Sequence, residues 1–244
     1  MPLPPSRALA LVWLLAAVPA AAQCPPAQRP QVMLERFIPA DCTACWQAPP
    51  PQVAGTESKP ALAIDWIVPS ASGDNAPMAT AALPEAAARS GAIRSDEALT
   101  VSHPLSSRSS LAVRVADGVA WHGYIGISLA VTYDASRPLP DGLVAYAALV
   151  ERIPACEEGT LVARRLVRSL IGPLALTGLA PGRPVEHRLA TRLPDVNRPE
   201  RLSMVGWVET AKGRIIAAAA SVNESCAELP AASSPSDAAS CPSK

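Results

Sequence analysis

The chain of 244 residues has no excess of charge of either sign, and only 4% of its residues are aromatic. Its 21 basic side chains are balanced by 21 acidic ones. A nucleic-acid-binding protein needs a concentrated basic face to neutralise phosphates, so this balance argues against nucleic acid as a partner. Lysine is scarce, with only Lys59, Lys212 and Lys244. With 27 prolines and much alanine, we attribute that scarcity to GC-rich coding rather than to function.

Several motifs of common enzyme classes are also missing. The chain has no G-x-S-x-G, no P-loop and no dinucleotide-binding glycine pattern. Its histidines, His103, His122 and His187, are far apart, and no second ligand pair with metal-like spacing accompanies the one CxxC. We therefore expect no cofactor and no metal centre. The hydrophobic fraction of 49% is high enough for a real core, which excludes wholesale disorder.

The N-terminus has the pattern of a secretory signal peptide. Arg7 precedes an apolar run, Ala8–Val18, and a small-residue end, Ala20–Ala22. The run is too short to span a bilayer, and no later stretch reaches that length. Gln23 stands before Cys24, where a lipoprotein signal has a small residue. We expect cleavage after residue 22, no stable membrane anchor afterwards, and a soluble periplasmic or secreted protein.

The predicted export indicates which chemistry the cysteines have. Six of them follow the predicted cleavage site, and an even number in an oxidising compartment favours disulfides. We predict a structural bridge between Cys156 and Cys226, because each follows a predicted core strand by a few residues. It would close about 70 residues and stabilise the fold by roughly 3–5 kcal/mol. The pairing of Cys24 and Cys241 is left open.

The chain divides near residue 106 by its hydrophobic pattern. Before that point we predict two buried strands, residues 31–38 and 61–68, then a helix over Met78–Ala92 and a polar connection. After it the residues alternate with period two, which indicates half-buried strands. Asp117-Gly118 is expected to be a turn, and the segments around Lys212-Gly213 a hairpin. Residues 161–171 fit a helix face or an edge strand.

One motif carries chemistry, Cys42-Thr43-Ala44-Cys45. It follows a predicted strand and is expected to begin a helical turn, where unpaired N–H groups and the helix dipole favour a thiolate at Cys42. Cys45, one turn further, could resolve a mixed disulfide. Asp41 is expected to cap the turn and, by like charge, to oppose the thiolate. An inert local disulfide is the alternative, because export favours oxidation of any nearby pair.

Several segments, taken in order, resemble a secreted thioredoxin-like family of unknown function from Gram-negative bacteria with a C-S-S-C-type motif. V-M-L-E-R-F-I-P-A-D-C-T-A-C-W (Val32–Trp46) is similar to the start of that family, and A-I-D-W-I (Ala63–Ile67) to its second strand. Its C-terminal β-rich region resembles Leu139–Glu151, Arg164–Leu174 and Arg201–Glu209. The resemblance implies that residues 161–171 are a strand. It also implies an α/β plus all-β fold, a thioredoxin-like domain followed by a β-sandwich-like region.

The expected organisation is a signal peptide (1–22), a truncated thioredoxin-like domain (30–105), a β-sandwich-like domain (106–226) and a disordered tail (227–244). The first domain is expected to be degenerate. Three prolines after the CxxC stop the helix within about two turns, whereas thioredoxin-like catalysts have a long helix there. A cis-proline opposite the disulfide also has no clear counterpart, Ser102-His103-Pro104 being the nearest.

The sequence is compatible with two functions. The first is a thiol–disulfide oxidoreductase with Cys42 as nucleophile and Cys45 as resolving thiol, its partners being other exported proteins. The second is a non-catalytic binding or assembly protein in which the CxxC is a structural disulfide. We expect the tryptophans to belong to the core rather than to a platform that stacks on a ligand; they are Trp46, Trp66, Trp121 and Trp207. We expect the arginines at 164, 165 and 168 to form a solvated face rather than an anion site.

Overall fold

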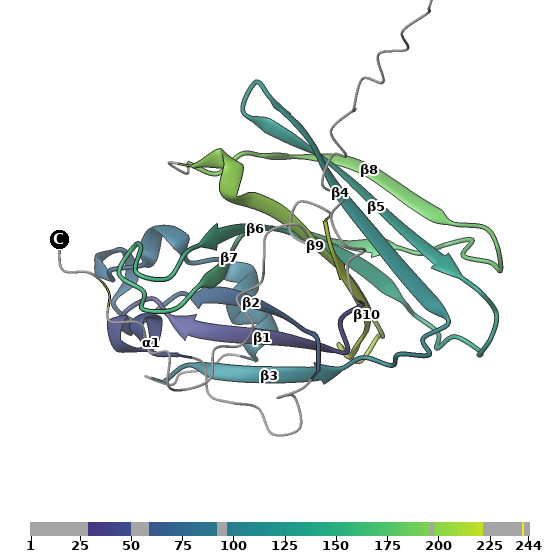
Figure 1. The fold of residues 1–244 in the computed structure, drawn as a ribbon, viewed down its shortest axis with the longest axis horizontal. Coiled ribbons are helices and arrows are strands. Elements are labelled where there is room, and N and C mark those ends of the chain that lie inside the picture. Colours follow the sequence, from purple (N-terminus) through teal and green to yellow (C-terminus); the bar gives the residue numbers. More distant parts are fainter. Residues whose placement is uncertain (1–28, 50–58, 92–96, 196–197, 222–240, 242–244) are drawn as a thin grey trace, which may run out of the picture.

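The computed structural model describes residues 29–49, 59–91, 97–195, 198–221 and 241 (Figure 1). The predicted signal peptide, Cys24, Cys226 and all of the predicted tail except Cys241 lie outside these residues. The described residues form ten strands: β1 (Val32–Pro39), β2 (Ala61–Val68), β3 (Leu99–Pro104), β4 (Leu111–Trp121), β5 (Tyr124–Tyr133), β6 (Val144–Ile153), β7 (Arg164–Ala175), β8 (Val185–Arg192), β9 (Leu202–Glu209) and β10 (Ile215–Ala220). The helices among them are α1 (Thr43–Gln47), α2 (Pro84–Ser90) and the short 3₁₀ turns η1 (Gly73–Asn75), η2 (Ala79–Ala81) and η3 (Pro199–Arg201).

Seven of the strands form one mixed sheet in the order β10-β9-β6-β7-β2-β1-β3. In its centre β1, β2 and β7 are parallel neighbours, and the register pairs Asp65 of β2 with Leu166 of β7. The other neighbours are antiparallel, including the predicted hairpin of β9 and β10. Strands from both sides of residue 106 therefore share one sheet (Figure 1).

The remaining strands form a second sheet in the order β4-β5-β8, which packs on part of the first. The period-two pattern predicted this layer: alternate residues of β5, such as Ile127 and Leu129, are buried against Leu149 and Met204 of the large sheet. Side chains of the second sheet pack directly on the backbone at Gly206, where an added Cβ would lie 3.1 Å from the Leu129 side chain. The two sheets enclose one core, so the expected β-sandwich-like packing is confirmed.

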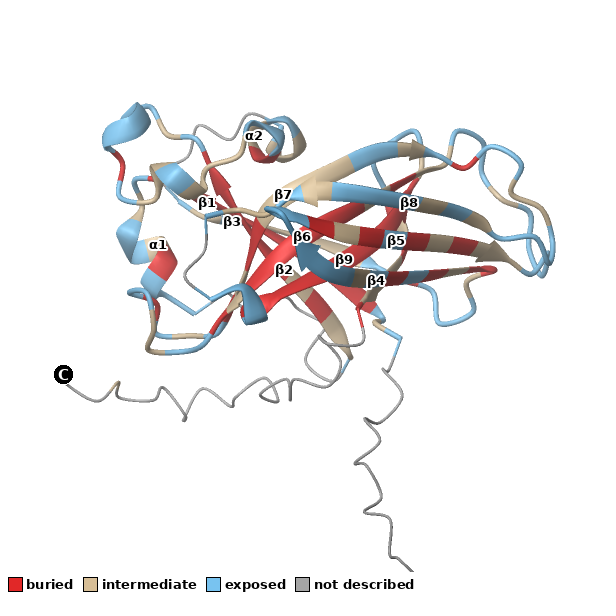
Figure 2. Cartoon of the chain, turned by 90° about the horizontal axis from the view of Figure 1, so that it is seen from above, coloured by how far each residue is buried: buried red, intermediate tan, exposed pale blue. Residues whose placement is uncertain are grey.

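The other end of the large sheet is covered by the helices (Figure 2). Phe37 and Trp66 pack with Ala86 of α2, whereas their chain neighbours Ile38 and Ile67 pack with Trp46 of α1. Because successive strand residues point to opposite faces, α1 and α2 lie on opposite faces of the β1–β2 pair. The short connection from β1 into α1 ends at Cys42, and Cys45 lies within α1.

The prediction of a thioredoxin-like α/β domain followed by a separate all-β region is wrong. The described residues are mostly strand, and their α-helices have only five and seven residues. The reason lies in long-range pairing. β7 joins the edge of β2, so the later strands extend the sheet of the earlier ones and do not form a sandwich of their own. No helix in the described part of the chain is long and apolar enough to cross a membrane.

Three local predictions are also decided. The resemblance implied a strand over residues 161–171, which the residue pattern left open; the strand is present but runs from 164 to 175. The helix predicted over Met78–Ala92 is confined to Pro84–Ser90, because Pro84 occupies its first turn and Gly91 ends it with a φ of 68°. The turn predicted at Asp117-Gly118 is wrong: β4 continues through an irregularity there to Trp121.

Candidate functional site

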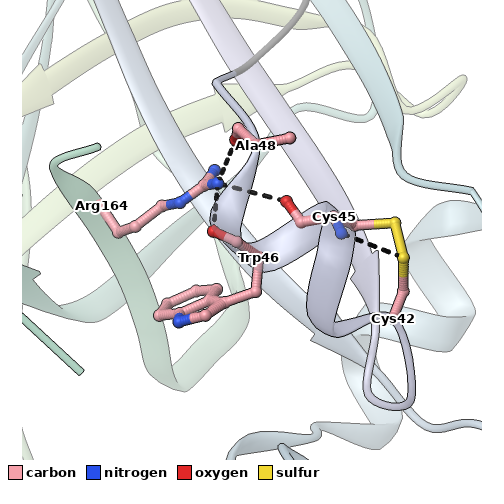
Figure 3. Close-up of a disulfide and its surroundings, with 5 residues drawn as sticks. All are labelled: Cys42, Cys45, Trp46, Ala48 and Arg164. Carbon is pink, nitrogen blue, oxygen red and sulfur yellow. Dashed lines mark hydrogen bonds between the residues drawn. A yellow bond between two sulfur atoms is a disulfide. The ribbon is translucent and has the colours of Figure 1, made fainter. Parts of the chain in front are cut away.

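The CxxC lies where β1 ends and α1 begins, and the disulfide between Cys42 and Cys45 is present with a Cα–Cα distance of 5.2 Å (Figure 3). Cys42 is the N-cap residue, and its sulfur accepts a hydrogen bond from the Cys45 N–H at 3.1 Å. Both cysteines are half-buried, and Thr43 and Ala44 between them are exposed. Asp41 does not cap the helix as expected; its carboxylate accepts a hydrogen bond from the Ser72 hydroxyl.

Helix α1 ends two residues after Cys45. Its C-cap residue, Ala48, has an extended conformation, with a φ of −68° and a ψ of 144°. Pro49 follows, and a proline disfavours helical geometry in the residue before it. The helix therefore has little more than one turn, and its last carbonyl groups need partners from outside the helix.

Arg164 at the start of β7 supplies those partners. One nitrogen of its guanidinium donates to the carbonyl oxygens of Cys45, Trp46 and Ala48, at 3.2, 2.6 and 2.6 Å (Figure 3). The guanidinium also lies 5.3 Å from the centre of the Trp46 ring. The side chain is fully buried, so the prediction of a solvated face is wrong at this position. A residue more than a hundred positions away thus caps the CxxC helix.

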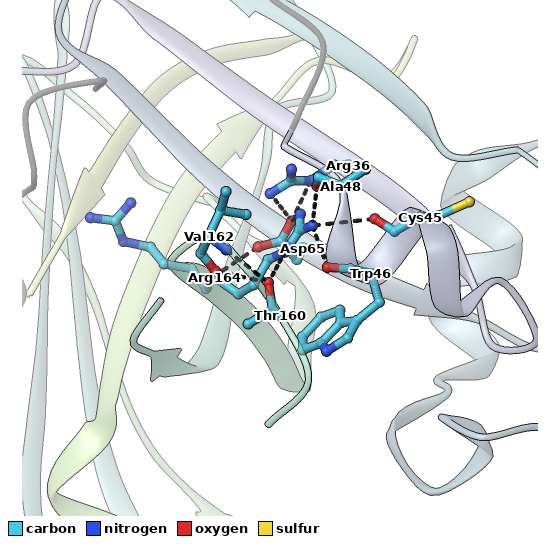
Figure 4. A network of polar contacts seen from close by, with 9 residues as sticks. Arg36, Cys45, Trp46, Ala48, Asp65, Thr160, Val162 and Arg164 are labelled. Atoms are coloured by element: carbon cyan, nitrogen blue, oxygen red, sulfur yellow. Dashed lines mark hydrogen bonds and ion pairs between the residues drawn. The ribbon is translucent and has the colours of Figure 1, made fainter. Parts of the chain in front are cut away.

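A buried ionic cluster surrounds Arg164 (Figure 4). Asp65 accepts hydrogen bonds from the Arg36 guanidinium and from the Arg165 N–H, and it lies 3.6 Å from Arg164. Burial lowers the pKa of Arg164 to about 10, and the second cation, Arg36, adds to this effect, while Asp65 opposes it. Arg164 is still protonated at neutral pH. The cluster therefore buries two cations against one carboxylate.

The loop between β6 and β7 closes over the same region. The Trp46 indole N–H donates to the Glu158 carbonyl oxygen at 2.9 Å, and the Thr160 hydroxyl accepts from Arg164 at 3.2 Å. Within this loop Cys156 is bonded to Cys241. The predicted Cys156–Cys226 bridge is therefore wrong, and Cys241 is not free to pair with Cys24. Sequence alone offers six cysteines and no distances, so it could not choose between these partners.

A second buried cluster lies on the opposite face, around Arg89 of α2. Its guanidinium contacts the carboxylates of Glu35 at 2.9 Å and Glu209 at 2.6 Å. It also lies 5.1–5.6 Å from the ring centres of three aromatic residues, Trp66, Tyr146 and Trp207. Burial alone would raise the pKa of Glu35, but the hydrogen bonds from His103 and Arg89 lower it below its ordinary value. This cluster fastens α2 to the sheet.

The sequence predicts the cysteine motif and the buried tryptophans better than the charged residues around them. Cys42 and Cys45 were found from their spacing, and Trp46, Trp66 and Trp207 are buried as expected. The arginines and carboxylates around them were missed. One signal was available, since Glu35, Arg36 and Asp65 interrupt otherwise apolar strands, and a charged residue in such a place needs a buried partner. Trp121 is the exception among the tryptophans, because it is exposed.

The chain matches no protein-family model and no curated protein in sequence. Two solved structures from Porphyromonas gingivalis are similar to it. HBP35 has 12% identity and a TM-score of 0.51, over 79% of this chain and 74% of that one. A domain of the outer membrane lipoprotein Omp28 has 9% identity and a TM-score of 0.34, over 47% of this chain and 88% of that one. The likeness to HBP35 shows a related fold.

Proposed function

We propose that this chain is an exported, non-catalytic binding protein in which the Cys42–Cys45 disulfide is a structural staple. The observation that carries the proposal is the buried Arg164, which holds the three backbone carbonyls that follow the CxxC. A catalytic CxxC must exist as a dithiol and as a disulfide in turn, and it must exchange with a partner. Here the backbone from the second cysteine onward is held by a buried side chain of β7, and Trp46 is buried beneath it.

Weak activation of Cys42 supports the same conclusion. A thiolate at a helix start is stabilised by unpaired N–H groups and by aligned peptide dipoles, and α1 has only five residues to provide them. The neighbouring Asp41 carboxylate opposes a negative sulfur. Ser102-His103-Pro104, the nearest match to a cis-proline partner, pairs with the start of β1, whereas the CxxC follows its end.

Export is supported from two sides. The N-terminal pattern of Arg7, Ala8–Val18 and Ala20–Ala22 is that of a secretory signal. In addition, both disulfides of the described residues need an oxidising compartment to form and persist. The protein would act in the periplasm or outside the cell.

The second candidate is a thiol–disulfide oxidoreductase. It is favoured by the position of the Cys42 sulfur at the N-cap, where it accepts the Cys45 N–H, and by the partial exposure of both cysteines. In that case Cys42 would attack a partner disulfide, and Cys45 would displace the reduced partner.

Trapping of mixed disulfides separates the two functions. We expect a Cys45→Ser variant to carry no covalently linked proteins after purification from the periplasm, as judged by mass spectrometry. The matched Cys42→Ser variant should behave in the same way, and the wild type should not reduce a model disulfide. If Cys45→Ser traps proteins, Cys42→Ser does not, and the wild type reduces the model disulfide, the non-catalytic proposal fails.

A further inference from the structure

Exposed apolar side chains gather at one end of the three-stranded sheet. Among the large hydrophobic residues of the described chain, the most exposed are Val119 at 85%, Trp121 at 72% and Tyr124 at 55%. All three belong to the tip of the β4–β5 hairpin. Exposed apolar side chains lower the solubility of a protein and add nothing to the packing of its core. Their clustering at the tip therefore indicates a surface that is covered when the protein acts.

The tip is a tight two-residue hairpin turn. His122 and Gly123 form its two-residue turn with φ values of 49° and 79°, as a type I′ hairpin requires. Trp121 and Tyr124 flank this turn as directly opposed residues. The end of β8 runs beside the hairpin up to its turn, because Arg192 pairs with Tyr124 and the Leu193 N–H donates to the Gly123 carbonyl oxygen. The two rings are therefore held side by side at this end of the sheet, where both are exposed.

The flank of the tip is basic. The register places Arg192 of β8 beside Tyr124 and Arg188 beside Ser128, on the outward face of the sheet. Both arginines are exposed. One carboxylate, Glu186, lies on the same face of β8 and is 3.5 Å from Arg188, and Asp117 lies in the irregularity of β4. Arg192 is thus the charge nearest the two rings.

We propose that the β4–β5 hairpin tip binds an anionic membrane surface. The inference rests on the proposed function, because it names the partner of an exported binding protein. Tryptophan and tyrosine have an apolar body and a polar end, which suits the boundary between lipid headgroups and acyl chains. Arg192 and Arg188 would pair with lipid phosphates, since a basic residue near an anionic surface is attracted to it. An exposed apolar tip with a basic flank fits the surface of a negatively charged lipid bilayer.

Vesicle sedimentation tests the proposal. The probes are vesicles of phosphatidylcholine alone and of phosphatidylcholine mixed with the anionic phosphatidylglycerol. We expect the wild type to bind the anionic vesicles more tightly, and to lose that preference as salt is raised. Replacing both rings, Trp121→Ala with Tyr124→Ala, should weaken binding about tenfold or more. Arg192→Gln should weaken it about fivefold at low salt and little at high salt.

Two matched variants serve as controls. Leu161→Ala removes an exposed apolar side chain from the loop before β7, and Arg214→Gln removes an exposed arginine away from the hairpin. Neither should change vesicle binding. All variants are purified in the same way and have the same N-terminus, so differences between them report the hairpin.

Three results would overturn the proposal. The first is no binding of wild type to anionic vesicles at low salt. The second is equal weakening by the control variants. The third is a self-associating protein that becomes monomeric in the Trp121→Ala variant without any vesicle binding, which would make the tip a contact between copies. Each leaves the trapping experiment on Cys42 and Cys45 untouched, so failure of the membrane inference is distinguishable from failure of the proposed function.

Discussion

One arginine holds a short helix on each face of the large sheet, partly buried Arg89 on one face and fully buried Arg164 on the other. Carboxylates outnumber cations around Arg89, whereas cations outnumber carboxylates around Arg164. On the α2 side Arg89 meets two carboxylates, Glu35 and Glu209. On the α1 side Arg164 shares one carboxylate, Asp65, with a second cation. Burial alone would lower the pKa of either guanidinium. It prevails at Arg164, whose pKa falls to about 10, whereas the carboxylates raise the pKa of Arg89.

The difference separates two ways to compensate a buried cation. Full negative charges compensate Arg89, so removing it would leave two carboxylates buried without a cation between them. Carbonyl dipoles do most of this work for Arg164, so removing it would leave unpaired carbonyl oxygens instead. We expect the α2 side to depend on charge and the α1 side to depend on hydrogen-bond geometry and on the disulfide of the loop beside it.

The largest effect is expected from that disulfide. Replacing Cys156 and Cys241 by serine removes a link between residues 85 positions apart. On the chain-entropy model the free energy of unfolding should fall by roughly 4–5 kcal/mol. Urea unfolding measures the loss, and hydrogen exchange should place the added opening around Trp46 and α1. Equal stability of wild type and variant would show that the link does not constrain the unfolded chain.

Arg89→Met should be next in size. It leaves Glu35 and Glu209 buried without their cation, so we expect a loss of about 3–5 kcal/mol in the free energy of unfolding. The control is Arg188→Met, whose side chain is 82% exposed, and it should change stability by less than about 0.5 kcal/mol. If the two variants unfold at the same urea concentration, the Arg89 cluster does not hold α2.

Arg164→Met should cost less, about 2–3 kcal/mol, because the carbonyls of Cys45, Trp46 and Ala48 lose a donor while Asp65 keeps Arg36. The exchange rate of the Ala48 N–H, which bonds to Ala44 within α1, should rise. Arg214→Met is the control and should leave that rate unchanged. A loss as large as that of Arg89→Met would contradict the distinction between charge and dipole compensation.

The smallest effect is expected in acid. The pKa of Glu35 lies below its ordinary value of 4.5, so the unfolded chain takes up this proton first as the pH falls. The stability that ionised Glu35 contributes is therefore present above about pH 4.5 and is lost as the pH falls through the folded-state pKa. In Glu35→Gln the free energy of unfolding should fall less steeply below pH 4.5 than in wild type. Glu85→Gln, at an exposed site on α2, should follow the wild-type curve; parallel curves for all three would exclude this role of Glu35.

Part of the fold could be read from single segments. The period-two pattern identified β5, and apolar runs identified β1 and β2 within one residue of their observed bounds. α1 ends just before Pro49, the first of the three prolines, as expected. These features depend on neighbours along the chain. The helix over Met78–Ala92 was overextended because its first part forms a 3₁₀ turn ahead of Pro84.

Of the candidate functional site, only Cys42 and Cys45 were predicted from the sequence. The spacing of Cys42 and Cys45 marked the motif, but the residues that decide its chemistry come from other strands. Arg164 looked like one of three surface arginines because nothing in its local sequence reveals that β7 will lie beside β2. The partner of Cys156 was missed for the same reason, since spacing along the chain carries no information on distance in space.

By itself the sequence determined where most of the strands occur, where the α1 turn ends and which cysteines stand one turn apart, because these follow from side-chain periodicity and from proline geometry over a few residues. It missed β3, which lies in the predicted polar connection, and β8. Only the tertiary structure decided that β2 and β7 pair, that Arg164 is buried against the CxxC helix, and that Cys156 bonds to Cys241. Those outcomes depend on the free energy of contacts between segments about 85 to 120 residues apart, which sums packing, charge burial and hydrogen bonding over the whole core.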